Sequence, residues 1–311
     1  MAVAKKDKAG RAGTVAGAGD GRARVDGEGA PEDAALGPLL RLAPGRPVDL
    51  GALDPSAVPG GPADKTAAVS ATARLAGPLA SLQERLYAAS TAGDRRRVLL
   101  ILQGMDTSGK GGTVKHVIGH LNPSGCRIKG FKAPTKEESE HSFLWRITRA
   151  LPLPGEIGIF DRSHYEDVLV ARVRELVPHD RLERRYEEIN EFEQSLADDG
   201  VTLVKVFLHI GYEEQRERLL ARLDNPDKHW KFSTGDIEDR AMWPAYQRAY
   251  EVALERCSSE AAPWYVVPAD RKWYRNWAVG KLLLEHLEAI GPAYPPGDFD
   301  VQECRKRLLA T

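Results

Sequence analysis

The chain has 311 residues, enough for one large domain or two smaller ones. Its 44 Lys and Arg residues nearly balance 45 Asp and Glu residues, so the whole molecule has no charge bias towards nucleic acid or an anionic membrane. The longest aliphatic run, Val98 to Leu102, is far shorter than the roughly 20 residues of a membrane helix. These features exclude a transmembrane protein and predict neither a nucleic-acid nor a membrane partner.

The cysteines and the N-terminus predict a cytoplasmic protein. Cys126, Cys257 and Cys304 are far apart and follow no Cys-x-x-Cys spacing, which excludes a disulfide framework and a cysteine-based zinc site. No apolar segment follows the basic residues Lys5 and Lys6, so we expect no secretory signal.

Composition divides the chain into four parts. Half of the first 30 residues are Ala or Gly, which predicts a disordered tail over residues 1–30. Residues 31–90 form an N-terminal extension with a helix from about Ala67 to Ala89, where leucines recur every three or four residues. We expect the core over residues 91–291 and a C-terminal tail over residues 292–311.

Short apolar runs alternate with helical segments through the core. The predicted strands are Val98 to Leu102 and residues 155–160, 201–208 and 264–267. Predicted helices cover residues 180–197 and 212–223 between them. Alternation of this kind predicts an α/β fold with three layers, in which helices cover both faces of a parallel sheet.

A glycine-rich segment, Gly-Met-Asp-Thr-Ser-Gly-Lys-Gly-Gly-Thr, directly follows the first predicted strand and precedes a helix. The glycines let backbone N–H groups approach an anion, and Lys110 supplies a positive charge, as in a phosphate-binding loop (P-loop). An ordinary strand-to-helix turn is the alternative. Gly111 stands where Ser or Thr normally contacts magnesium. The predicted loop residues are Gly104, Thr107, Ser108, Gly109, Gly111, Gly112 and Thr113.

Two carboxylates are placed to hold a metal ion. Asp106 lies inside the loop, and Asp161 ends the strand over residues 155–160, where P-loop enzymes carry a magnesium ligand. Arg162 adds a permanent cation beside them. A turn-forming Asp106, a helix-capping Asp161 and a surface Arg162 are the alternatives.

Positive charge is concentrated near the loop. Between Arg95 and Ala150 there are 11 Lys and Arg residues against four acidic residues. This surplus predicts a long polyanionic ligand, although single lysines in such a region often only face solvent. The candidate channel residues are Lys115, Arg127, Lys129 and Lys132.

A lid is predicted over about residues 212–250. A helix carrying Arg216, Arg218 and Arg222 is followed by a turn and by a second helix from about Asp236 through Tyr250. Arms of this kind close over substrates in phosphoryl-transfer enzymes and bring arginines to the transferring group. An ordinary helical hairpin is the alternative.

Six motifs together resemble the second family of polyphosphate kinases, and the match runs from about Leu40 to the C-terminus. They are the loop at residues 104–113, Gly-Phe-Lys-Ala-Pro-Thr at 130–135, Phe-Leu-Trp-Arg at 143–146, Phe-Asp-Arg-Ser-His-Tyr-Glu-Asp-Val-Leu at 160–169, His-Trp-Lys-Phe at 229–232 and Ala-Pro-Trp-Tyr-Val-Val-Pro-Ala-Asp-Arg-Lys-Trp at 262–273. The form of the 160–169 motif resembles the polyphosphate:nucleotide phosphotransferase branch.

This resemblance implies a P-loop kinase-like enzyme, a phosphotransferase with a phosphate group as acceptor. It implies magnesium-dependent phosphoryl transfer between inorganic polyphosphate and a nucleoside mono- or diphosphate. Asp106 and Asp161 would hold Mg²⁺, with Mn²⁺ as an alternative, and the loop Asp would replace the hydroxyl missing at Gly111. The implied catalytic residues are Asp106, Lys110, Asp161, Arg162 and the lid arginine Arg222.

The acceptor and one side chain stay open at this point. We expect purine nucleotides, AMP or ADP and GMP or GDP, and a homo-oligomer. Glu166 would orient metal-bound water or the acceptor, and a helix-surface position explains it equally well. An ATP-dependent small-molecule or nucleotide kinase and a non-catalytic P-loop nucleotide-binding module are the alternatives; the basic surplus and loop Asp disfavour the first, and the paired carboxylates and lid disfavour the second.

Overall fold

The computed structural model describes residues 34–311, and the tail predicted over residues 1–30 lies outside them. Five parallel strands form one sheet in the order β2-β3-β1-β4-β5. The strands are β1 (Arg97–Gln103), β2 (Cys126–Gly130), β3 (Ile157–Asp161), β4 (Val201–His209) and β5 (Trp264–Pro268). Leu102 of β1 pairs with Asp161 of β3, so the loop after β1 begins beside this carboxylate.

The helices connect the strands and extend beyond them at both ends. They are α1 (Gly37–Leu40), α2 (Lys65–Ser90), α3 (Lys110–Val117), α4 (Lys136–Ser139), α5 (Trp145–Thr148), α6 (Glu166–Val173), α7 (His179–Asp198), α8 (Tyr212–Leu223), α9 (Gly235–Ala241), α10 (Trp243–Arg256), α11 (Lys272–Ile290) and α12 (Val301–Leu309).

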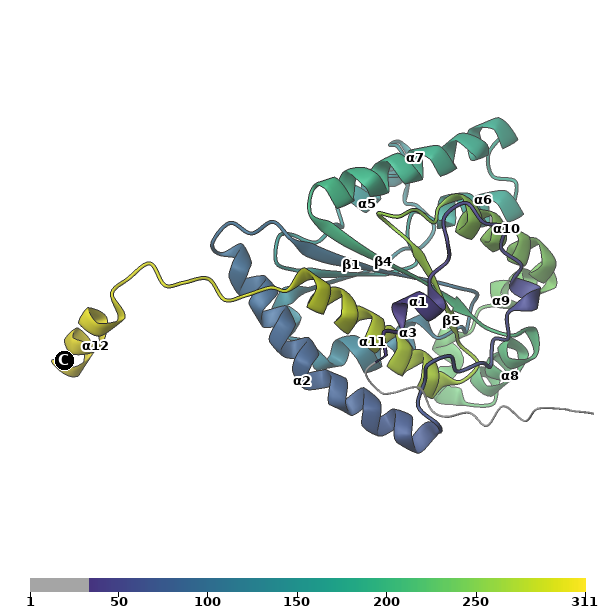
Figure 1. Cartoon of the computed structure of the whole chain (residues 1–311). Helices are drawn as coiled ribbons and strands as arrows, with labels where there is room; N and C mark the ends of the chain where they lie inside the picture. The colour runs from purple at the N-terminus through teal and green to yellow at the C-terminus, as the bar shows by residue number, and fades with distance from the viewer. Residues whose placement is uncertain (1–33) are drawn as a thin grey trace, which may run out of the picture.

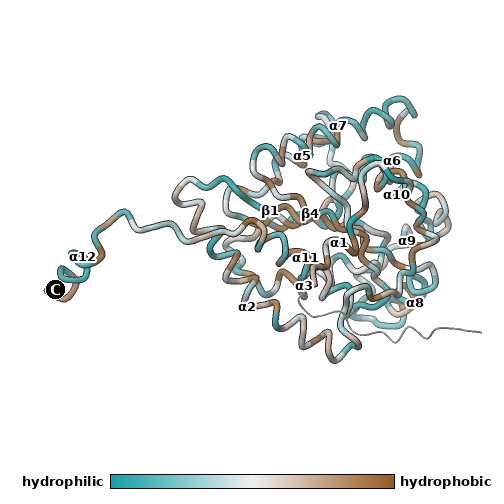
Figure 2. Tube along the Cα trace, viewed as in Figure 1, coloured by the Kyte–Doolittle hydropathy of each residue, from teal (hydrophilic) through white to brown (hydrophobic). Residues whose placement is uncertain are grey.

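The sheet lies between two helical layers (Figure 1). Side chains alternate across β1: Val98 and Leu100 pack with α2, α3 and α11, whereas Leu99 and Ile101 pack with α6, α7 and α10. A strand buried on both faces must be apolar throughout, which explains its continuous aliphatic run. Figure 2 shows the hydrophobic stretches along β1 and β4 at the centre of the molecule. The predicted parallel sheet with helices on both faces is confirmed.

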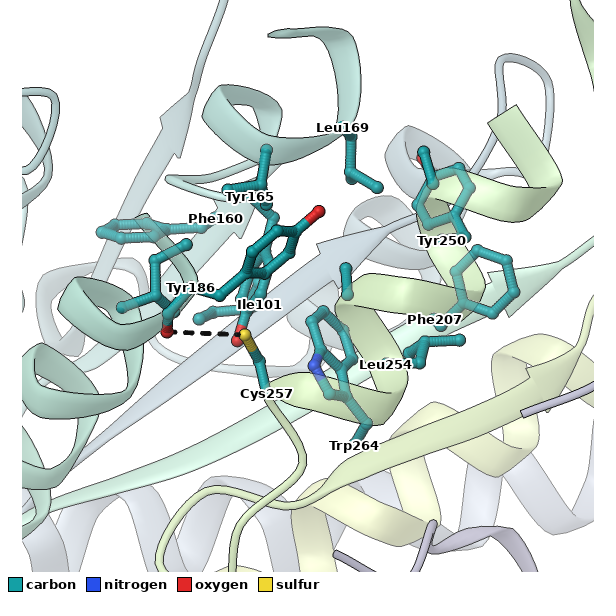
Figure 3. Close-up of a cluster of buried hydrophobic side chains, with 14 of the residues drawn as sticks. Ile101, Phe160, Tyr165, Leu169, Tyr186, Phe207, Tyr250, Leu254, Cys257 and Trp264 are labelled. Carbon is teal, nitrogen blue, oxygen red and sulfur yellow. Dashed lines mark hydrogen bonds between the residues drawn. The ribbon is translucent and has the colours of Figure 1, made fainter. Parts of the chain in front are cut away.

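The layer on the α6, α7 and α10 side contains an aromatic cluster (Figure 3). Tyr165 stands edge-on to Trp264, with ring centroids 4.7 Å apart. Beneath them Lys205 Nζ lies 2.5 Å from Glu193 Oε2 and donates to the Tyr165 hydroxyl at 2.9 Å. Both charged side chains are at most 1% exposed, so their ion pair compensates for the loss of hydration on burial.

The structure corrects two details of the predicted elements. The sequence predicts four strands, which are β1, β3, β4 and β5, but not β2, an edge strand whose side chains are exposed or half-buried. The single helix predicted from Asp236 through Tyr250 is wrong: α9 ends at Ala241 and α10 begins at Trp243. Pro244 lies in the first turn of α10, where the missing N–H needs no partner.

Two observations concern the described residues as a whole. No helix within residues 34–311 is long and apolar enough to cross a membrane. The cysteines are unpaired, and burial raises the pKa of the Cys126 thiol to about 11 and that of Cys257 to about 12. Cys304 lies on α12, which Figure 1 shows apart from the sheet and its helices.

Candidate active site

The loop between β1 and α3 has a shape that only glycine permits at two positions. A Cβ on Gly104 would lie 2.7 Å from the Leu208 carbonyl oxygen. Gly109 has a φ of +107°, and a Cβ there would lie 1.7 Å from Nη1 of Arg275. The backbone of the loop therefore packs closely against β4 and α11. The side of the loop that faces away from them is left for an anion.

Lys110 lies at the start of α3 and is nearly buried. Its Nζ donates to the Gly104 carbonyl at 2.8 Å, and burial and the neighbouring Arg162 lower its pKa. Three hydroxyl oxygens of the same segment, in Thr107, Ser108 and Thr113, are buried without a hydrogen-bond partner in the described part of the chain. Buried polar groups of this kind are costly unless a ligand completes them.

Arg162 links the loop to the end of β3. Its Nη2 donates to Oδ1 of Asp106 at 2.7 Å, and its Nη1 lies 3.2 Å from Oε2 of Glu166. The backbone of Arg162 has a φ of +67°, a strained conformation of the type that accumulates at functional sites. The negative charges of Asp106 and of Asp161, the residue before Arg162, both act to raise the pKa of Lys110 and so favour its charged form. The structure thus brings together four of the five predicted catalytic residues.

The pKa values of Asp106 and Glu166 are shifted in opposite directions. Burial acts to raise the pKa of Asp106, but the charges of Lys110 and Arg162 outweigh it and hold that pKa below its ordinary value. Burial raises the pKa of Glu166 despite the same two cations. Asp106 is therefore the more readily ionised group, which suits a metal ligand.

Oxygen ligands are what Mg²⁺ prefers, and Asp106 and Asp161 could supply two of them. Within residues 34–311 no three Asp, Glu, His or Cys side chains form a complete metal cluster. The pair fits an ion that keeps water and takes further oxygens from phosphates. Gly111 contributes no ligand, and a Cβ there would meet nothing within 4 Å.

The fifth predicted catalytic residue, Arg222, lies near the end of α8 in the predicted lid. Its Nη1 donates to the Lys231 carbonyl at 2.9 Å and lies 3.3 Å from Oδ2 of Asp236. Its charge also contributes to the lowered pKa of Asp106. Arg222 is thus held within the predicted lid and near enough to act on the loop electrostatically.

Two neighbouring cavities open beside this cluster. The larger, about 640 Å³, extends from Arg162 and Glu166, and the smaller, about 300 Å³, adjoins it, since Glu138 and Arg146 line both. Four cations line the smaller pocket: Arg127, Lys129, Arg146 and Arg149.

The predicted channel residues are distributed unevenly over these cavities. Arg127 and Lys129 lie together in the smaller pocket, where Arg127 Nε also donates to Glu156 at 3.0 Å. Lys132 lines the larger cavity, whereas Lys115 is exposed on α3 and lines neither.

Comparison with known proteins shows the family of the chain. The profile of polyphosphate kinase 2 (PPK2) matches residues 63–293. The chain belongs to the polyphosphate kinase 2 family. It is 51% identical over 242 residues to an AMP/ADP-polyphosphate phosphotransferase of Meiothermus ruber, covering 78% of this chain and 88% of that protein. It is 44% identical over 229 residues to an ADP-polyphosphate phosphotransferase of Rhodopseudomonas palustris, covering 70% of this chain and 78% of that protein.

A solved structure agrees with this assignment. The crystal structure of polyphosphate kinase 2 from Arthrobacter aurescens TC1 superposes with a TM-score of 0.87 at 47% identity, covering 89% of this chain and 98% of that one. The family resemblance and the fold class inferred from the sequence are therefore confirmed.

Sequence reasoning missed two contacts to the loop of this polyphosphate kinase 2 family member. Arg275 of α11 donates to the Ser108 carbonyl at 3.1 Å, and Arg218 of α8, which the sequence assigns to the predicted lid, donates to the Thr107 carbonyl at 2.9 Å. Both guanidinium groups are buried. For Arg275 the one signal in the sequence is that this arginine lies on a mostly apolar helix.

Proposed function

We propose that this protein transfers a phosphoryl group between inorganic polyphosphate and a nucleoside mono- or diphosphate. The observation that carries the proposal is the P-loop cluster with two adjoining cavities, one of them walled by four cations. A mononucleotide alone needs no second, strongly basic pocket, whereas a long polyanion does. The names of the two relatives support the same reaction.

The donor and the acceptor occupy different parts of this site. The terminal phosphates of polyphosphate lie on the loop, where Lys110 and backbone N–H groups neutralise them, and the chain continues past Lys132 to Arg127 and Lys129. The nucleotide binds in the part of the larger cavity formed by Phe143 and Val177, whose apolar side chains suit a base, and the polyphosphate chain passes the part formed by Lys132.

The chemistry requires no general base. The attacking oxygen belongs to a phosphate that is already largely ionised at neutral pH, so catalysis consists of aligning two polyanions and neutralising charge as the donor bond breaks. Arg162 is fixed between Asp106 and Glu166 and therefore costs little reorganisation. Arg222 adds a second permanent cation from the lid.

A divalent ion would complete this charge balance. Asp106 and Asp161 would hold Mg²⁺, with Mn²⁺ as an alternative, and the ion would supply positive charge to the phosphate groups during transfer. Glu166 would then orient Arg162 and water near the ion, which its hydrogen bond to Arg162 supports.

The finer features of the reaction are part of the same proposal. The acceptors are purine nucleotides, AMP or ADP and GMP or GDP. The names of the relatives include AMP and ADP, which supports the adenosine nucleotides. The enzyme works in the cytoplasm, where these nucleotides are abundant, and as a homo-oligomer.

One assay tests the proposal: polyphosphate with Mg²⁺ is incubated with AMP, ADP, GMP and GDP separately, and the products are quantified. Lys110→Ala and Asp161→Asn should each lower the rate by about 10²-fold or more, because each removes a preorganised charge. Lys65→Ala, an exposed lysine outside both cavities, is the matched control. Circular dichroism verifies folding.

Two results would contradict the proposal. Turnover with ATP and none with polyphosphate would favour an ordinary nucleotide kinase. A folded Asp161→Asn enzyme with a normal rate would remove Asp161 from the metal site.

A further inference from the structure

Arg275 is a buried cation that lacks a carboxylate partner among the described residues. Its side chain lies on α11, which packs against α3, and it is 3% exposed. Nη1 donates to the Ser108 carbonyl at 3.1 Å, while Nε and Nη2 donate to Oδ1 of Asn276 at 3.2 and 2.8 Å. Burial and the nearby Arg218 lower its pKa to about 10. Holding a charge in this position destabilises the protein unless something compensates for it.

The guanidinium lies directly behind the loop. Its nearest atoms are 1.7 Å from the Cβ position of Gly109 and 2.9 Å from that of Gly112, so these glycines leave the space that it fills. Arg218 approaches the same backbone and donates to the Ser108 carbonyl at 3.3 Å. Arg218 forms an ion pair with Glu214 at 2.6 Å. Of the two arginines, Arg275 is therefore the one without an ionic partner among the described residues.

Contact with the Ser108 carbonyl also sets the direction of an N–H group. In a planar trans peptide, the C=O of one residue and the N–H of the next point in opposite directions. A Ser108 carbonyl directed at Arg275 therefore directs the Gly109 N–H away from α11, towards the open side of the loop. No acceptor for this N–H is found within residues 34–311.

We propose that Arg275 is a positioning residue for the phosphate held on the loop: it aims the Gly109 N–H at that phosphate and supplies from behind a charge that the bound anion compensates. The inference rests on the proposed function for the identity of the anion, polyphosphate. It assigns a role in the site to α11, whose side chains do not line the two cavities beside the loop.

The proposal predicts opposite changes in stability and in binding. Replacing a buried unpaired charge by an apolar side chain of similar length is often neutral or stabilising. Arg218 continues to satisfy the Ser108 carbonyl in Arg275→Met, so this variant should melt at or above the wild-type temperature without ligand. Its affinity for an anion on the loop should nevertheless fall, by about tenfold or more, because the positive charge behind the loop is lost and the Ser108 carbonyl keeps only its longer hydrogen bond, 3.3 Å, to Arg218.

The test compares the full-length wild type with Arg275→Met, Arg275→Lys and the control Arg271→Met. Arg271 immediately precedes α11, is exposed and bonds to the Ser56 carbonyl, away from the loop. Melting temperatures are measured without ligand, and tripolyphosphate binding is measured by calorimetry without nucleotide. We expect tenfold weaker binding in Arg275→Met, partial recovery in Arg275→Lys and no change in Arg271→Met.

A lower melting temperature with tripolyphosphate affinity within twofold of the wild type would overturn the proposal, because Arg275 would then serve only the fold. If both quantities fall, Arg275→Lys decides: recovered affinity supports the proposal and unrecovered affinity overturns it. Since binding is measured without turnover, a wild type that binds tripolyphosphate but transfers no phosphate would contradict the proposed function and leave this test intact.

Discussion

Replacing Gly109 by alanine should unfold the enzyme at a much lower temperature. At a φ of +107° an alanine is strained by about 1–3 kcal/mol. Its Cβ would also lie 1.7 Å from Nη1 of Arg275, a clash with a buried group whose relief costs a further 1–3 kcal/mol or so. The expected loss of stability is about 2–6 kcal/mol, which corresponds to roughly 5–20 °C in melting temperature for a domain of this size.

Two further variants separate these contributions. Gly111→Ala, two residues on, meets nothing within 4 Å and lies in α3, so it should be neutral or stabilise the enzyme by up to about 1 kcal/mol. In an Arg275→Ala background, Gly109→Ala should cost only the backbone strain, about 1–3 kcal/mol. Denaturant unfolding followed by circular dichroism measures the wild type, the three single variants and the double variant. Equal stability of Gly109→Ala and Gly111→Ala would refute the reasoning.

Two further predictions concern stability away from the loop. Lys205→Met should destabilise the protein by about 3–5 kcal/mol because it leaves Glu193 charged and buried. Adding Glu193→Gln should recover part of this loss. Equal stability of the Lys205→Met and double variants in denaturant would contradict the prediction. Burial lowers the pKa of His286, so the unfolded chain binds the proton first and stability should fall below about pH 6.5, by at most ~1.4 kcal/mol per pH unit. In a pH series of unfolding curves, the free energy of unfolding should vary less with pH in His286→Gln than in the wild type. An unchanged pH dependence would show that His286 does not cause it.

The apolar pattern predicted the central strands because burial leaves a direct mark on composition. Every residue of β1 is buried, and its aliphatic run is visible in the sequence. The edge strand β2 lacks such an apolar run: Ile128 is 56% exposed and is flanked by Arg127 and Lys129. The hydrogen bonds of β2 to β3, and not its side chains, make it a strand. A buried strand can be predicted from composition and an exposed one cannot.

The site divides along a similar line. Residues adjacent to the loop in sequence, such as Lys110, or placed at the end of a neighbouring strand, such as Asp161, follow from topology alone. Arg275 comes from a helix more than 150 residues later, and on a helix an arginine ordinarily faces solvent. Its position depends on the packing of α11 against α3, which no local pattern encodes.

The arrangement of the three thiols makes the protein suitable for attachment at a single point. Burial raises the pKa of Cys126 and Cys257, so these thiols resist deprotonation, whereas Cys304 is carried by α12, beyond the proline-containing segment 291–300 and apart from the sheet and its helices (Figure 1). A maleimide probe or resin should therefore couple to Cys304 in the native state.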